Sequence, residues 1–180
     1  PRKDMRDAEE KSDLQRIMGF DMTRLPGIGY DTAAVVFSEI GSDFSRFPTE
    51  KHFASYIGLA PSLGKSAGKN VRQRKRCKNT SRAGRALRMA ASTLCRSQTE
   101  LGAFFRSVAR RSDRKTAVKA TARRMAHLIY RAVRHGAAYA DNGAQAYEKR
   151  MRERAVRAVH KLIKSHNINE LELSTAFATG

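Results

Sequence analysis

The sequence is short of several residue types, and the most informative gap concerns acids. Between Lys51 and Thr99 there is no aspartate or glutamate, although twelve lysines and arginines lie in this stretch. A folded surface ordinarily mixes both signs of charge, because a single-sign surface repels itself. The gap therefore predicts a polyanionic partner, and a phosphate backbone is the polyanion that fits best.

Other scarce residues exclude other classes of protein. Two cysteines without a CxxC partner and five scattered histidines give neither a disulfide framework nor a metal-ligand cluster, so we expect no metal site in this chain. No apolar run approaches the ~20 residues of a membrane span. The basic residues also lack the Trp/Phe-rich apolar face of a membrane-surface helix. With no signal peptide at its start, the chain is expected in the cytoplasm and away from membranes.

The net charge of +19 is unevenly distributed along the 180 residues. Residues 1–50 hold seven basic and ten acidic side chains, whereas residues 100–180 hold seventeen basic and seven acidic ones. The first fifty residues thus have an ordinary mixed surface, and the remainder has the charge of a nucleic-acid-binding face.

The apolar periodicity predicts a mainly α fold, and four parts can be distinguished. Residues 1–57 are expected to form helix-hairpin-helix-like helices, including a helix over 5–19, one over 31–40 with Ala34, Val35 and Ile40 inward, and a short one capped by Thr49. Residues 58–79 form a basic loop, with short strands expected around Leu59 and Val71. Residues 80–140 form a bundle of long helices, and residues 141–180 a C-terminal helix and tail.

The helix after the basic loop is predicted to be amphipathic. Thr80 or Ser81 caps it, and Ala83, Leu87, Ala90 and Leu94 share one arc at about 100° per residue. Arginines occupy the opposite arc, so one side packs and the other faces phosphate. The side chains expected to contact nucleic acid here and in the loop are Lys65, Lys69, Arg72, Arg74, Lys75, Arg76, Lys78, Arg82, Arg85 and Arg88.

The later helices follow the same rules. Residues 100–111 carry an apolar side that includes Phe104 and Phe105, and Asp113 is expected to cap a long helix that ends before Gly136. Residues 143–166 repeat the pattern among charges of both signs. That last helix is expected to be more exposed and to pack against another chain.

Two short motifs suggest specific chemistry. Leu25-Pro26-Gly27-Ile28-Gly29 resembles the hairpin of a helix-hairpin-helix motif, in which the backbone of Gly27, Ile28 and Gly29 grips a phosphate. The alternative is a plain interhelical turn. The second motif is Lys65-Ser66-Ala67-Gly68-Lys69, where nearby cations favour a serine alkoxide; the alternative is an ordinary loop serine.

The order of several sequence blocks resembles one family. The blocks are LPGIG…TAA…EIG, FP…K…ASYIGLAP, KSAGK, RALRMAASTL, LGAFF and KTAVKATARRMAHLIYRAVRHGAAY. They are similar to the C-terminal transposase domain of insertion-sequence elements whose recombinases are guided by a bridge RNA, with the pilin-gene inversion recombinases as relatives. The resemblance covers roughly residues 14–160.

The resemblance implies a serine-dependent mechanism shared between two domains. In that family, an N-terminal RuvC-like domain carries four metal-binding acids, and the C-terminal domain carries the serine that attacks the DNA phosphate. The matching residue is Ser66, with Ala67 in place of the more common glycine and Ser62 as the second candidate. Mg²⁺ is expected only in the N-terminal domain, and no cofactor in this chain. DNA, a guide RNA and a second copy of the chain are the expected partners, in the nucleoid of a bacterium or archaeon.

Nothing in the sequence predicts the RuvC-like sheet itself. We therefore expect either part of a longer transposase or a decayed or split gene product, one that binds nucleic acid but does not complete strand exchange alone. Two further interpretations stay open. One is a non-catalytic helix-hairpin-helix module that binds duplex DNA or structured RNA. The other is an assembly role in which residues 143–166 pair between protomers.

Overall fold

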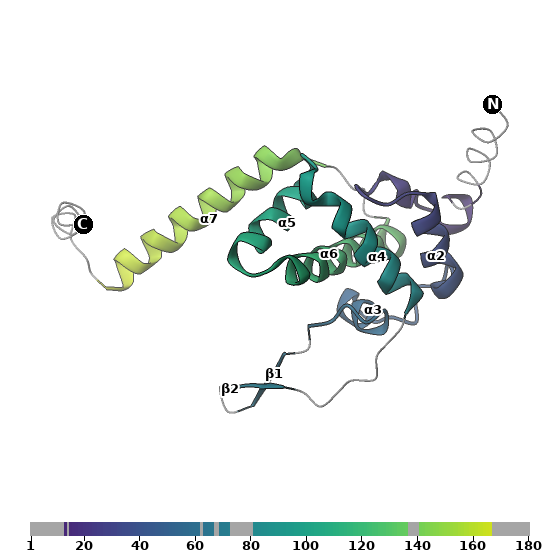
Figure 1. The fold of residues 1–180 in the computed structure, drawn as a ribbon, viewed down its shortest axis with the longest axis horizontal. Helices are drawn as coiled ribbons and strands as arrows, with labels where there is room; N and C mark the ends of the chain where they lie inside the picture. The colour runs from purple at the N-terminus through teal and green to yellow at the C-terminus, as the bar shows by residue number, and fades with distance from the viewer. Residues whose placement is uncertain are drawn as a thin grey trace.

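The fold is mainly α, as expected (Figure 1). The computed structural model describes residues 13, 15–61, 81–136 and 141–166, together with the backbone of residues 63–66 and 69–72. Residues 15–18 are helical. The elements that follow are η1 (Met22–Arg24), α2 (Tyr30–Ile40), α3 (Glu50–Tyr56), β1 (Leu63–Ser66), β2 (Lys69–Arg72), α4 (Arg82–Thr93), η2 (Leu94–Arg96), α5 (Glu100–Arg111), α6 (Arg114–His135) and α7 (Gly143–Ser165). No helix in the described ranges has both the length and the apolar character needed to cross a membrane.

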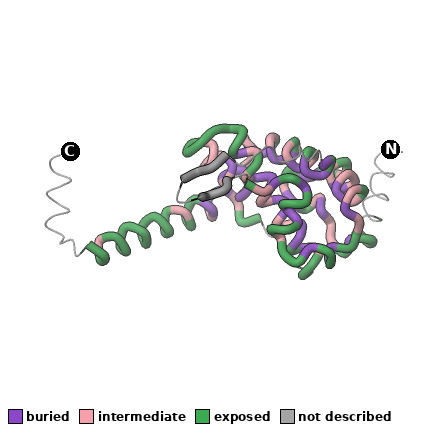
Figure 2. Tube along the Cα trace, turned by 90° about the horizontal axis from the view of Figure 1, so that it is seen from below, coloured by how far each residue is buried: buried purple, intermediate pink, exposed green. Residues whose placement is uncertain are grey.

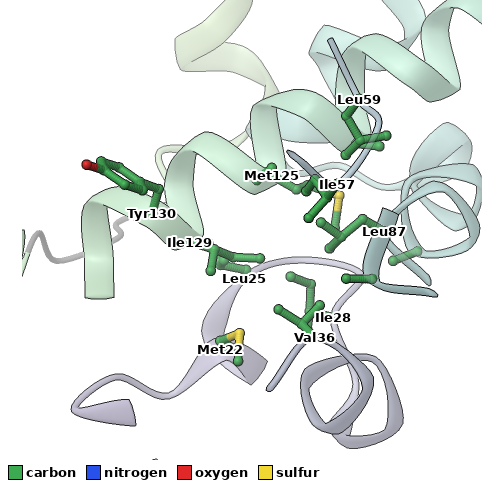
Figure 3. Close-up of a cluster of buried hydrophobic side chains, with 14 of the residues drawn as sticks. Met22, Leu25, Ile28, Val36, Ile57, Leu59, Leu87, Met125, Ile129 and Tyr130 are labelled. Atoms are coloured by element: carbon green, nitrogen blue, oxygen red, sulfur yellow. The ribbon is translucent and has the colours of Figure 1, made fainter. Parts of the chain in front are cut away.

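The body of the molecule is built around α6, against which α3, α4 and α5 pack, while α2 packs on α4. The interior between these helices is apolar. Leu25, Val36, Leu87, Met125 and Ile129 are all fully or almost fully buried within it (Figure 3). At the edge of this core, the Tyr130 hydroxyl donates to the Phe47 carbonyl oxygen over 2.8 Å. This bond ties α6 to the segment before α3.

The predicted helix starts are confirmed at the level of individual hydrogen bonds. The side chains of Thr49, Ser81 and Asp113 each accept from a backbone N–H in the first turn of α3, α4 and α6. Gly136 ends α6 in the left-handed conformation at φ 61°. Local capping chemistry therefore determines where these helices begin and end.

Two details differ from the sequence prediction. In α2 the buried residues are Ala33, Val36 and Ile40, so the predicted inward positions of Ala34 and Val35 are wrong by one residue. The helix docks on α4 with a slightly different rotation from the one that its apolar residues suggest. In the basic loop, Val71 does lie on a strand, but Leu59 does not; it is buried and its N–H donates to the Ala54 carbonyl oxygen over 2.8 Å.

The first turn of α4 lies unusually close to the end of α3. A Cβ atom added to Gly84 would overlap the carbonyl oxygen of Ile57, so only glycine fits between the two backbones. Leu59 and Ser81 are also buried at this junction. As a result, the chain leaves the body just after Ile57 and re-enters it just before Gly84, at the same place.

The last helix is docked only at its beginning. Ala144 and Tyr147 are buried against Ala103 and Phe104 of α5, and Met151 is half-buried beside them. Beyond that point α7 extends away from the body (Figures 1 and 2), and its residues are exposed with the exception of a half-buried Ile163. The predicted exposure of this helix is confirmed.

Replacing Gly84 by alanine tests the close approach of α3 and α4. The added methyl group must displace backbone, so we expect Gly84→Ala to lower the free energy of unfolding by about 1–3 kcal/mol. Gly29→Ala is the matched control, because nothing lies within 4 Å of a Cβ at Gly29. We expect the control to cost about 1 kcal/mol or less. Chemical denaturation followed by circular dichroism measures both, and equal destabilisation of the two variants would contradict the proposed packing.

Candidate nucleic-acid interface

The outer face of α4 is cationic, as the helical spacing predicts. Arg82 and Arg85 are exposed, and Arg88 is half-buried at the edge of this face. Arg96, in η2, lies about two turns beyond Arg88. Met89 is 67% exposed between Arg85 and Arg96, one turn from the first and two from the second. The face therefore combines guanidinium groups with one large apolar side chain that the sequence prediction did not single out.

These arginines stand where a helix ordinarily prefers acids. The positive end of the helix dipole lies at the N-terminus, and the first turn of α4 contains no acid. Glu39 of α2 supplies one instead, since its carboxylate accepts from the Ala83 N–H over 2.5 Å. Among the described residues, no carboxylate forms an ion pair with Arg82, Arg85 or Arg88. Their charge is thus not neutralised by an ion pair within the described part of the chain.

Glu39 could not be found from the sequence. It lies 44 residues before its partner and carries no local signal. The contact exists because α2 packs on α4, which brings the end of α2 to the beginning of α4.

The hairpin Leu25–Gly29 packs beside the same helix. Leu25 and Ile28 are buried, and Gly27 adopts φ 81°. A Cβ atom at Gly27 would lie 3.0 Å from the Ala90 carbonyl oxygen and 3.1 Å from the Leu94 side chain. The glycine at this position is therefore explained by packing as well as by the turn.

The outward side of the hairpin stays open. Gly27 and Gly29 are both exposed, and Gly29 caps α2 without a side chain of its own. The contacts of this hairpin with α4 are made through Ala90 and Leu94, which lie on the apolar arc of the helix, opposite Arg82, Arg85 and Arg88. The hairpin therefore packs on the buried side of α4, and its exposed backbone is a separate predicted contact region.

The residues before and after the basic segment, Ile57 and Ser81, both lie at the N-terminal end of α4. Within this segment, β1 and β2 form an antiparallel hairpin in which Ser66 pairs with Lys69 and Leu63 with Arg72. This β-hairpin of β1 and β2 packs chiefly on itself and stands away from the helical body (Figure 1). Ser66 is the last residue of β1, and the strand positions include Lys65, Lys69 and Arg72. Arg74, Lys75, Arg76 and Lys78 lie outside the described residues.

Other arginines of the body are already engaged by acids. Arg124 and Arg150 both bind the buried carboxylate of Glu100, over 2.6 and 2.7 Å. Arg131 binds Glu50 over 2.6 Å, and this hydrogen bond holds the pKa of Glu50 below its usual range. His127 lies 3.4 Å from Glu50, and burial lowers the pKa of its ring. These cations hold helices together, whereas those of α4 do not.

The described side chains do not form a metal-ligand cluster. They contain no group of three histidines, cysteines or acids close enough to hold a metal ion. Cys95 is a half-buried free thiol, and Cys77 falls outside the described ranges. The chemistry that this part of the chain supports is the binding of anions through exposed guanidinium groups and backbone N–H groups.

Comparison with known proteins identifies a family that part of the chain resembles. Residues 21–106 match the family model described as the transposase IS116/IS110/IS902 family, which takes in the hairpin, the basic segment, α4 and the first half of α5. Over 50 residues the chain is 48% identical to the insertion element IS110 uncharacterized 43.6 kDa protein of Streptomyces coelicolor (strain ATCC BAA-471 / A3(2) / M145). That match spans 28% of this chain and 12% of the relative. The similarity supports a transposase domain of this family over residues 21–106.

Replacing Arg82, Arg85 and Arg88 by glutamine tests the α4 face. Each phosphate that the protein no longer neutralises lowers the slope of log K against log salt by about 0.9, so the slope of the triple variant should fall by up to about 2.7. The unaltered chain, if it neutralises six to ten phosphates, should lose roughly 10³–10⁵ in affinity for duplex DNA between about 50 and 200 mM salt. Fluorescence anisotropy with a labelled duplex measures both. A salt-independent affinity would contradict an electrostatic interface.

Proposed function

We propose that this chain is the DNA-binding C-terminal part of an insertion-sequence transposase and that it supplies the serine nucleophile for strand cleavage and exchange. The observation that carries the proposal is the cationic face of α4, which begins where the chain returns from the basic segment. The family match over residues 21–106 covers the whole of this arrangement. The proposed compartment is the cytoplasm, where the DNA is accessible.

The proposed reaction is transesterification at Ser66. The Oγ atom bonds to the scissile phosphorus, the bridging P–O bond breaks, and the serine proton ends on the departing sugar oxygen. Neither an oxidant nor a reductant is needed. Lys69 is the cross-strand partner of Ser66 in the register of β1 and β2, which supports its assignment to the phosphate. Lys65 precedes Ser66 in the chain, and its assignment comes from the sequence motif alone. The acids that bind Mg²⁺ belong to the proposed RuvC-like domain, and the guide RNA is a further proposed partner.

A suicide-substrate assay tests the role of Ser66. The chain is incubated with nicked, labelled element-end DNA and Mg²⁺, with and without a separately supplied RuvC-like domain. We expect a covalent protein–DNA adduct on denaturing gels that requires the added domain and is lost in Ser66→Ala. Ser62→Ala is the matched control and should leave the adduct in place.

The same assay distinguishes the alternative function. If both serine variants and the unaltered chain bind the duplex tightly but form no adduct under any condition, the nucleophile is wrong. The chain is then a non-catalytic helix-hairpin-helix nucleic-acid-binding module. Affinity should barely change in Ser66→Ala in either case, because a serine hydroxyl contributes little to phosphate binding compared with the cations around it.

Homo-oligomer formation also stays a prediction, and we assign it to the C-terminal helix. Val156, Val159 and Leu162 are 50%, 53% and 57% exposed on α7, which supports this assignment. We expect deletion of residues 143–180 to convert the oligomer to a monomer, as measured by light scattering. An unchanged mass would contradict the assignment.

A further inference from the structure

The distal half of α7 presents a straight ridge of cations that the α4 interface does not include. Arg150, Arg154, Arg157, Lys161 and Lys164 follow one another at intervals of four, three, four and three residues. At about 100° per residue, this spacing keeps all five within a narrow strip of the helix surface. Arg154, Arg157, Lys161 and Lys164 are exposed along the part of the helix that has left the body.

Arg150, the first residue of the ridge, is held by an ion pair, whereas the other four cations have no ion-pair partner among the described residues. Arg150 binds Glu100 over 2.7 Å, and the Asp141 carboxylate accepts from the N–H groups of Glu100 and Gly143 over 2.9 and 3.0 Å. These contacts join the start of α7 to α5. Beyond Arg150, Glu153 is the only acid up to Lys164. Within the described ranges, none of the four distal cations forms an ion pair.

The opposite side of the same helix is apolar. Ala155, Val156, Val159, Leu162 and Ile163 occupy the arc away from the ridge. Of the lysines and arginines between residues 150 and 164, Arg152 alone shares this arc, and the other five form the ridge. This stretch contains no tryptophan, tyrosine or phenylalanine, the side chains that anchor a helix in a membrane interface. The charge pattern therefore favours a phosphate backbone over a lipid surface.

We propose that the ridge formed by Arg154, Arg157, Lys161 and Lys164 is a second phosphate-binding surface, which contacts the backbone of duplex DNA. The ridge spans about 15 Å, a length of duplex that carries roughly nine phosphate charges. It lies outside the matched segment of residues 21–106. The inference rests on the proposed function for its ligand, but it concerns a separate surface.

The test replaces the four ridge residues by glutamine in the full chain, as R154Q/R157Q/K161Q/K164Q. Glutamine keeps the helix propensity while removing the charge. With a random-sequence 30-bp DNA duplex, we expect the slope of log K against log salt to fall by about 0.9 for each phosphate that is no longer bound, up to about 3.6. At about 150 mM salt this corresponds to roughly a fivefold weaker affinity per phosphate. The variant R154K/R157K keeps the charge and should bind like the unaltered chain.

A second quadruple variant controls for net charge. R110Q/R111Q/R114Q/K115Q removes the same charge from exposed positions at the junction of α5 and α6. We expect its salt slope to change by less than one. An equal fall in affinity in both quadruple variants would show a bulk charge effect and overturn the proposal, as would full binding by the ridge variant.

Parallel measurements separate this inference from the proposed function. If replacement of Arg82, Arg85 and Arg88 weakens binding but the ridge variant does not, the ridge proposal is wrong and the α4 interface stands. If only the ridge variant weakens binding, the ridge stands and the α4 interface is wrong. The affinity of the same variants for a double-stranded RNA of equal length shows whether the ridge binds RNA phosphates instead. Ridge-dependent binding to anionic vesicles, with DNA affinity unchanged, would overturn the proposal.

Discussion

The close contact between the beginning of α4 and the end of α3 is the constraint on which the candidate interface depends. Because Gly84 lies directly against the Ile57 carbonyl oxygen, the basic segment leaves and re-enters the body at one point. The same contact orients the first turn of α4, so Arg82 and Arg85 stand beside that point. Gly27 makes a comparable contact with Ala90 further along the helix. Two glycines thus set how closely α4 packs against the end of α3 and against the hairpin.

The distribution of charge follows a consistent division within this architecture. Acids of the helical body are used as structural partners: Glu100 holds the start of α7, Glu50 holds α6, and Glu39 completes the beginning of α4. The arginines bound by Glu100 and Glu50 connect one helix to another through these ion pairs. The cations of α4 and of distal α7 have no such partner among the described residues. A compact fold tolerates this local excess when a polyanion neutralises it.

Local signals in the sequence predicted much of the fold. They did not predict the contacts between residues that lie far apart in the sequence. Caps such as Thr49, Ser81 and Asp113 act within one helical turn, so their effect can be read from neighbouring residues. The rotation of α2 and the role of Glu39 depend on which helix packs against which, whereas the exposure of Met89 follows from the helical periodicity that places it among the arginines. For the site, the α4 arginines follow from helical periodicity. Whether Ser66 is a nucleophile follows only from resemblance to a family, and it remains a prediction.

Photo-crosslinking from the centre of the α4 face is the most direct test of the interface. A photoreactive residue in place of Met89, which is 67% exposed among the arginines, should crosslink efficiently to a bound DNA duplex. The same residue in place of the exposed Ser38 of α2 serves as the control and should not. Crosslinking at Met89 alone would place α4 on the DNA. Equal crosslinking at both positions, or none at Met89 while the duplex is bound, would contradict the account.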